Sequence, residues 1–238
     1  MRVLFVEHDH TSPPGPVAEA FAKRSFDVDE VIIVPAERFK SPDVGFEVPA
    51  ASTYDVVVPM GAPWSAVPGR DSNIASWLLP ELQWLREAHA ANVPILGICF
   101  GGQLLARALG GSVQRSSRPE IGWTAVDTDR PDLVSAGPWF EWHYDAFTPP
   151  PGAVEIARNE VTSQAYVIGR SLGVQFHPEL MSDGLAQWLD HGGAELARDH
   201  GLDPDELLGS AVTEGVAAAA RADTLVAAFL DFANLQAE

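Results

Sequence analysis

A single cysteine lies between two glycines in a segment whose spacing suits a nucleophile. Cys99 occupies the centre of Gly97-Ile98-Cys99-Phe100-Gly101, with an apolar run before it and a helical pattern after it. This spacing predicts a tight strand-to-helix turn with the thiol exposed at its apex, the geometry of a nucleophile elbow. Side chains at positions 97 and 101 would collide in such a turn. The glycines favour a nucleophile over the small buried hydrophobe that a lone cysteine more often is.

The helix expected after Cys99 would help a thiol nucleophile in two ways. Its positive N-terminal end favours the thiolate over the thiol. Its free N–H groups can bind an oxyanion, and that of Phe100 is the first candidate.

Among the seven histidines, His177 is best placed to act as the base. It ends the apolar run Gly173–Phe176 and is followed by Pro178 and Glu179. Residues i and i+2 at a strand end point to one side. Glu179 can therefore reach one ring nitrogen of His177 while the other nitrogen faces the thiol, which predicts a Cys-His-Glu triad.

Apolar strands and helical patterns alternate through the first half of the chain. The expected strands are Arg2–Glu7, Val28–Val34, Tyr54–Pro59 and Pro94–Ile98. The expected helices are Pro16–Ser25, Asn73–Ala91 (interrupted or restarted near Pro80) and Phe100–Leu109. This alternation predicts an α/β fold with a mainly parallel, open twisted sheet that helices cover on both faces.

The second half is richer in strands and predicts a small antiparallel addition to the sheet. The expected strands are Trp123–Val126, Phe140–His143, Ala153–Ala157, Gln164–Ile168 and Gly173–Phe176. Helices are expected at about Asp183–His200 and Val212–Leu235, the latter with an inner stripe of Leu225, Phe229 and Phe232. With no repeat or linker, residues 1–238 are interpreted as one domain with a C-terminal helical extension at about 200–238.

Composition limits the classes of partner and compartment. The formal net charge of −18 disfavours nucleic-acid binding. No run of about 18 apolar residues is present, so neither a spanning helix nor a membrane partner is expected. The N-terminal segment is too short and too acidic for a signal peptide. The single cysteine excludes an intrachain disulfide and favours a reducing, cytoplasmic compartment.

Together, Gly97–Gln103 and Gly173–Glu179 resemble the class I (triad) glutamine amidotransferase family, especially the glutaminase part of GMP synthase and its stand-alone relatives. Met60–Ser65 lies where that family has its Gly-Gly-Pro oxyanion loop, and Phe140–Asp145 resembles the segment before the last triad strand. The resemblance implies a flavodoxin-like fold.

The resemblance also implies a reaction. Cys99 would attack the side-chain amide of glutamine, His177 would pass the thiol proton to departing ammonia, and Glu179 would orient His177. Water would then hydrolyse the γ-glutamyl thioester to glutamate, without a metal or an organic cofactor. The remaining implied roles are the oxyanion N–H groups of Phe100 and of Gly61 or Ala62, and substrate binding by Gln103.

The chain departs from the family pattern at two places, the oxyanion loop and a segment that bears on substrate identity more than on reaction type. The oxyanion loop reads Gly61-Ala62 where Gly-Gly is usual, and alanine would distort the loop if a positive φ were needed. The segment Arg118–Trp123 differs from relatives that use this region to grip the α-groups of glutamine. A γ-glutamyl peptide hydrolase with the same triad is therefore the alternative, and a catalytically idle binding module is a third reading.

The chain contains neither an ATP-using domain nor a P-loop sequence, so the ammonia is expected to serve a separate synthetase subunit. The segment Glu7-His8-Asp9-His10 contains metal-binding residue types. Adjacent residues rarely ligate one ion together, so it is interpreted as a polar loop that lines the substrate pocket. His143 and Asp145 are expected to support the site or face a partner, and Trp64 and Trp142 to wall the pocket.

Overall fold

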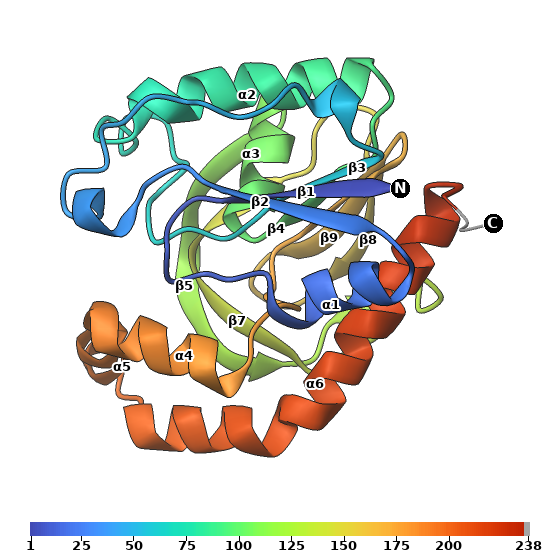
Figure 1. Cartoon of the computed structure of the whole chain (residues 1–238). Coiled ribbons are helices and arrows are strands. Elements are labelled where there is room, and N and C mark those ends of the chain that lie inside the picture. Colours follow the sequence, from blue (N-terminus) through green and yellow to red (C-terminus); the bar gives the residue numbers. More distant parts are fainter. Residues whose placement is uncertain (236–238) are drawn as a thin grey trace.

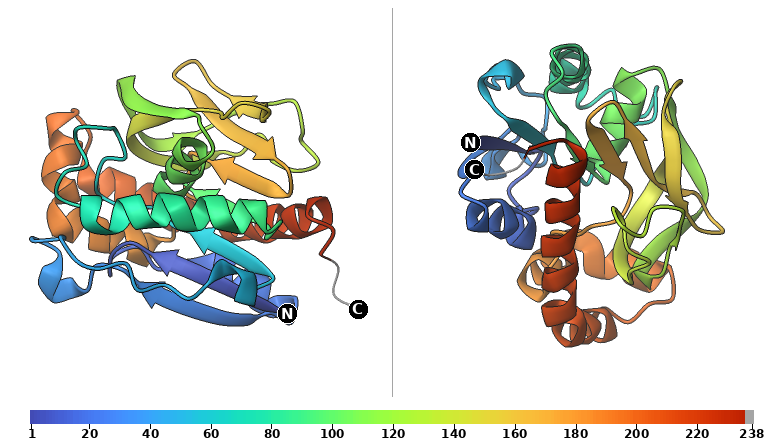
Figure 2. Two further views of the ribbon diagram at one scale, coloured as in Figure 1. Left: turned by 90° about the horizontal axis from the view of Figure 1, so that it is seen from above. Right: turned by 90° about the vertical axis from the view of Figure 1, so that its right-hand side faces the viewer.

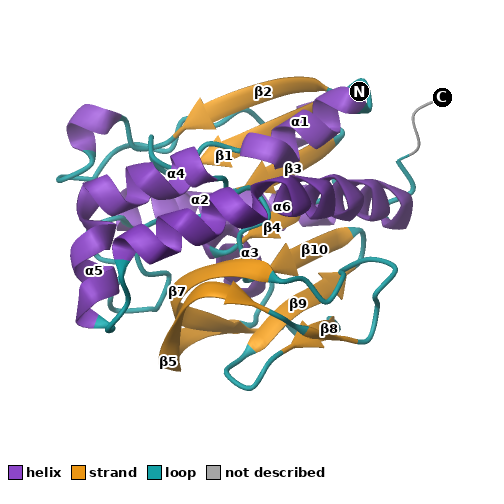
Figure 3. Ribbon diagram, turned by 90° about the horizontal axis from the view of Figure 1, so that it is seen from below, coloured by secondary structure: helices purple, strands orange, loops and turns teal. Residues whose placement is uncertain are grey.

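The computed structural model describes residues 1–235 and is built around one row of strands (Figure 1). The last three residues of the expected C-terminal extension, 236–238, lie outside this description. In order across the row, the strands are β2 (Asp27–Ile32), β1 (Arg2–Glu7), β3 (Val56–Pro59), β4 (Leu96–Ile98), β10 (Ser171–Val174), β9 (Ser163–Ile168), β8 (Val154–Arg158) and β6 (Asp127–Thr128). Figure 3 labels this row from β2 to β8.

Parallel pairing holds one half of this row and antiparallel pairing the other. β1 pairs parallel with β2 and β3, an isolated parallel bridge joins β3 to the residue before β4, and β4 pairs parallel with β10. From β10 through β9 and β8 to β6 the pairing is antiparallel. The strands β5 (Ser112–Thr124) and β7 (Trp139–Thr148) form a separate antiparallel ribbon. The expected α/β class is confirmed.

Helices cover both faces of the parallel part, because alternate residues of β1 enter different cores. Val3 and Phe5 pack with α1 (Gly15–Lys23) and α6 (Pro204–Phe232). Leu4 and Val6 pack with the opposite pair of helices, α2 (Ala75–Ala90) and α3 (Phe100–Ala108). Figures 1 and 2 show α2 and α3 on one side of the strands and α1 with α6 on the other.

Two helices differ from expectation near prolines. The helix α2 runs through Pro80 without interruption. Proline has no N–H, so the carbonyl of Ser76 loses its helical hydrogen bond. Both residues lie on the exposed face, where water can replace that bond. The helix α6 begins at Pro204, well before the expected Val212. Asp203 caps it by accepting a hydrogen bond from the N–H of Asp205, and this Asp-Pro start is a recognisable helix signal.

The other helical segment of the second half is broken where one helix was expected. Its pieces are α4 (Ser182–Trp188), a π-helical turn (Leu189–Gly193) and α5 (Ala194–Asp199). Gly192 has φ +106°, which lets the chain turn there. Short 3₁₀ turns occupy Ala36–Arg38 and Ala51–Thr53. The inner stripe of α6 is confirmed, with Leu225 and Phe229 buried and Phe232 partly buried.

Most of β5 was not expected, and it replaces the predicted strand Trp123–Val126. It is a long, largely polar strand that pairs with β7, and its register shifts between Arg115 and Glu120. Only the last two residues, Trp123 and Thr124, fall within the predicted strand. Among residues 1–235, no helix is long and apolar enough to cross a membrane.

Candidate active site

Cys99 stands in a strained turn between β4 and α3. Its φ of 49° and ψ of −105° lie outside the regions that non-glycine residues ordinarily adopt. A Cβ on Gly97 would lie 2.8 Å from the carbonyl oxygen of Gly101. A Cβ on Gly101 would overlap the carbonyl oxygen of Pro59, on the neighbouring strand β3. The tight turn therefore requires glycine at both positions. At position 101 the reason is close packing against the backbone of β3.

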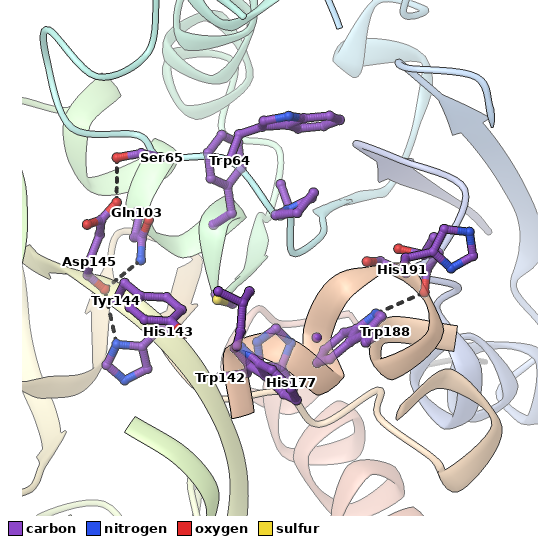
Figure 4. A pocket seen from close by; sticks show the side chains of 18 of the residues that line it. Trp64, Ser65, Gln103, Trp142, His143, Tyr144, Asp145, His177, Trp188 and His191 are labelled. Carbon is purple, nitrogen blue, oxygen red and sulfur yellow. Dashed lines mark hydrogen bonds between the residues drawn. The ribbon is translucent and has the colours of Figure 1, made fainter. Parts of the chain in front are cut away.

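The structure brings His177 and Glu179 together at the end of β10. The Nδ1–H of His177 donates to Oε1 of Glu179 at 2.8 Å, and both side chains are buried. Burial by itself lowers the pKa of His177. The negative charges of Cys99 and Glu179 outweigh it and raise this pKa well above its usual value. Cys99 and His177 line one pocket (Figure 4), and Nε2 of His177 has no hydrogen-bond partner among the described residues.

Two glutamine side chains form a buried chain that ends at the sulfur. Gln175 donates from Nε2 to Sγ of Cys99 at 3.5 Å. Gln103 donates from Nε2 to Oε1 of Gln175 at 3.3 Å and to the carbonyl oxygen of Asp145 at 2.9 Å. Gln103 also lines the pocket. Gln175 was not anticipated, although it lies two residues before His177 on an extended segment.

The loop after β3 carries the expected oxyanion residues Gly61 and Ala62. Neither residue has a positive φ, so alanine fits at position 62 without backbone strain. Gly61 packs on His177, since a Cβ there would lie 3.1 Å from Cε1 of that ring. Ala62 lines the pocket, and within residues 1–235 its N–H has no hydrogen-bond acceptor. The N–H of Phe100 is also free, because Phe100 is the first residue of α3.

The pocket around Cys99 has a volume of about 210 Å³ and combines aromatic walls with one ion pair. Trp64 and Trp142 line it as expected, together with Trp188. Arg115 donates from Nη1 to Oδ1 of Asp145 at 3.2 Å. Figure 4 shows Asp145, Gln103 and Ser65 on one side and His177 with Trp188 on the other. No local pattern in the sequence points to Arg115 or Trp188, because each reaches the pocket through long-range pairing or packing.

A second buried histidine, His143, holds the backbone of Asp145 at the side of the pocket. Nε2 of His143 lies 3.1 Å from Oε2 of Glu120 and 3.3 Å from Oε2 of Glu141, and Nδ1–H donates to the carbonyl oxygen of Asp145 at 3.1 Å. Burial lowers the pKa of His143, but the two carboxylates outweigh it and raise this pKa to about 10. Burial also raises the pKa of Glu141. The expectation that His143 supports the site agrees with this position.

The four polar residues Glu7–His10, at and just after the end of β1, point in different directions. Glu7 lies near Glu30, and burial, followed by this charge and that of Asp9, raises the pKa of Glu7 to about 8. Asp9 accepts hydrogen bonds from Thr11, and the ring of His10 packs on that of Phe39 at a centroid distance of 5.3 Å.

His8 turns inward, toward Gly61 and toward Glu81 of α2. The described residues contain no group of three potential metal ligands. The expectation that this segment lines the pocket is wrong for His8 and His10. The next residues, Thr11 and Ser12, line it instead.

Comparison with known proteins gives consistent similarities. The GMP synthase [glutamine-hydrolyzing] of Aeropyrum pernix is 40% identical over 115 residues, which are 42% of this chain and 22% of that protein. A protein of Sulfolobus acidocaldarius that is named as one subunit of GMP synthase [glutamine-hydrolyzing] is 32% identical over 136 residues, 53% of this chain and 68% of that protein. The chain thus spans about a fifth of the length of the first relative.

A crystal structure of a glutamine amidotransferase from Thermotoga maritima superposes with a TM-score of 0.80 at 26% identity, covering 97% of this chain and 98% of the other. The model of the family glutamine amidotransferase class-I matches residues 65–190. This match covers more than half of the sequence, including Cys99, His177 and Glu179. The chain therefore belongs to the class-I glutamine amidotransferase family.

Proposed function

We propose that this protein hydrolyses the side-chain amide of glutamine to glutamate and ammonia, with Cys99 as nucleophile, His177 as acid and base, and Glu179 as its orienting partner. One observation carries the proposal. The only cysteine of the chain occupies a strained elbow, in one pocket with a buried histidine that is hydrogen-bonded to a buried carboxylate at 2.8 Å. These are the parts that nucleophilic catalysis by a thiol requires.

The reaction balances with these groups alone. Sγ of Cys99 attacks Cδ of the amide after its proton has passed to Nε2 of His177. The oxyanion accepts hydrogen bonds from the N–H groups of Phe100 and Ala62. His177 then gives its proton to the leaving nitrogen, and ammonia departs. A water molecule attacks the thioester and returns one proton to His177, and cleavage of the C–S bond releases glutamate and regenerates Cys99.

The ion pair in the pocket suits an α-amino acid. Asp145 is buried, and its carboxylate also accepts a hydrogen bond from Oγ of Ser65 at 2.5 Å. We assign the α-ammonium group of the substrate to Asp145 and its α-carboxylate to Arg115. The volume of about 210 Å³ is below the roughly 300–1,000 Å³ of pockets for drug-sized ligands, which supports a small substrate.

We further propose that the ammonia serves a separate synthetase. The relative from Sulfolobus acidocaldarius, of which this chain covers 68%, is named as one subunit of GMP synthase. By analogy with that subunit, the acceptor reaction would take place on a partner subunit.

A γ-glutamyl peptide hydrolase is the second candidate, favoured by a further group of rings in the pocket. Phe39, Trp64 and His191 line the pocket together, with Phe39 packing on both other rings. Such a wall could hold a leaving group larger than ammonia.

The test measures turnover of glutamine and of several γ-glutamyl peptides by the wild type and by Cys99→Ala. We expect release of ammonia from glutamine, and a loss of about 10³-fold or more on removal of the nucleophile. Faster turnover of the peptides would favour the second candidate. Full activity of Cys99→Ala would refute the nucleophile, and binding without turnover or thioester formation would indicate an idle binding module.

A further inference from the structure

His8 is fully buried beneath the oxyanion loop and is held from two sides. It follows the end of β1, and its Nδ1 lies 3.1 Å from the carbonyl oxygen of Gly61. Its Nε2 lies 3.0 and 3.2 Å from the two carboxylate oxygens of Glu81, which is fully buried on α2. His8 is not a lining residue of the pocket. Any effect of the pair on catalysis must therefore pass through the loop and not through contact with the substrate.

The acceptors around His8 define where its protons lie. The carbonyl oxygen of Gly61 can only accept a hydrogen bond, so Nδ1 must carry hydrogen. Nε2 shares a proton with the carboxylate of Glu81. Burial lowers the pKa of His8, but the charge and hydrogen bond of Glu81 outweigh it and leave this pKa raised. His8 is thereby fixed as a donor to Gly61.

This hydrogen bond fixes the orientation of a whole peptide unit. The Gly61–Ala62 bond is trans, since the only cis bond among the described residues is Gly137–Pro138. In a planar trans peptide the C=O and the N–H point in opposite directions. With the carbonyl of Gly61 held on the buried side by His8, the N–H of Ala62 points to the other side, where Ala62 lines the pocket with Cys99.

The same ring also touches the other wall of the expected oxyanion site. The rings of His8 and Phe100 meet edge-on with centroids 4.9 Å apart. The ring of Trp77, on α2, packs on His8 with a centroid distance of 5.6 Å. His8 thus contacts both the Gly61 carbonyl, whose peptide unit carries the N–H of Ala62, and the ring of Phe100, from a buried position where it has little freedom to move.

We infer that His8, anchored by Glu81, is a positioning residue that holds the N–H of Ala62 toward the oxyanion formed at Cys99. The inference rests on the proposed function, in which Ala62 and Phe100 bind that oxyanion. It assigns a role to His8 and Glu81 that neither residue type nor local spacing suggests.

The experiment compares two reactions of Cys99 in the full-length protein. Acylation by p-nitrophenyl acetate, followed as a burst of p-nitrophenol, passes through an oxyanion. Alkylation by iodoacetamide also needs the thiolate but forms no oxyanion. The variants are His8→Leu, which removes the donor, His8→Asn, which offers an amide nitrogen near the place of Nδ1, and Glu81→Gln. The matched controls on α2 are His89→Leu and the exposed Glu87→Gln.

We expect His8→Leu to lower the acylation rate by about 10²- to 10³-fold, the usual cost of one oxyanion donor, while alkylation stays within about threefold of the wild type. His8→Asn should recover part of the acylation rate, Glu81→Gln should show a smaller loss than His8→Leu, and both controls should match the wild type.

Unchanged acylation in His8→Leu, or equal losses in both reactions, would overturn the inference. So would a His8→Asn variant as slow as His8→Leu, or a wild type that is alkylated but never acylated. The proposed function fails separately: a wild type that the ester acylates but that hydrolyses neither glutamine nor γ-glutamyl peptides would reject it, and the comparison of variants would still decide the role of His8.

Discussion

The side-chain amide of Gln175 donates a hydrogen bond to the sulfur of Cys99 across 3.5 Å, from a buried position on the segment that leads to His177. A donor at the sulfur stabilises the thiolate more than the thiol. One short extended segment therefore supplies Gln175, which contacts the sulfur, and, two residues later, His177, which lines the same pocket as Cys99.

Replacing Gln175 with leucine should slow alkylation of Cys99 by iodoacetamide at neutral pH about five- to tenfold. This is the effect of losing one hydrogen bond worth about 1 kcal/mol. The exposed Gln83→Leu on α2 is the control. Equal alkylation rates for Gln175→Leu and the wild type would mean that the contact does not stabilise the thiolate.

Replacing Gly101 with alanine should destabilise the fold by about 3 kcal/mol or more, because the new Cβ would overlap the backbone oxygen of Pro59. Gly209→Ala is the matched change, since a Cβ there meets nothing within 4 Å on α6 and should raise stability by about 0.5–1 kcal/mol. Urea unfolding measures both. A Gly101→Ala protein as stable as the wild type would contradict the tight elbow.

Glu7→Gln should change the pH dependence of stability. The pKa of Glu7 is raised from 4.5 to about 8 by burial, Glu30 and Asp9, so between these values the folded protein binds more protons than the unfolded chain. The free energy of unfolding of the wild type therefore falls as pH rises from about 4.5 to about 8. The variant lacks this contribution.

The stability of Glu7→Gln relative to the wild type should accordingly increase over that interval. Thermal unfolding at several pH values measures it, with the exposed Glu19→Gln on α1 as control. A constant difference between wild type and Glu7→Gln from pH 4.5 to 8 would argue against a raised pKa.

Asp145→Asn should raise KM for glutamine more than it lowers kcat, because the amide cannot pair with the α-ammonium group by charge. A loss of roughly 10-fold or more in kcat/KM corresponds to one charge-assisted hydrogen bond. Alkylation by iodoacetamide, which needs no α-groups, reports whether the elbow is intact. The exposed Asp183→Asn is the control, and an unchanged KM for Asp145→Asn would remove Asp145 from substrate binding.

The residues that were predictable from sequence are those whose partners lie close along the chain. The elbow around Cys99 depends on glycines within two residues, and His177 reaches Glu179 across one proline. His8 and Glu81, by contrast, are 73 residues apart, and no local pattern connects them. Their pairing arises only when β1 and α2 pack together.

The same distinction explains the errors in the elements. The strand β5 has little apolar alternation, and it forms because β7 supplies its backbone partners. The break at Gly192 depends on one residue with φ +106° inside an otherwise helical pattern. Asp203 and Pro204 are a local signal for the start of α6. The predicted start was too late because it was based on the apolar stripe farther along the helix.

The strained backbone at position 99 also allows the single thiol to report whether the turn is folded. An unfolded chain relaxes to ordinary backbone angles, because the β3 and α3 neighbours that enforce the turn are no longer assembled. With one cysteine in 238 residues, every labelled sulfur reports on this one turn. A difference in labelling rate between folded and unfolded chains would therefore measure the assembly of the turn directly, without a substrate or a tag.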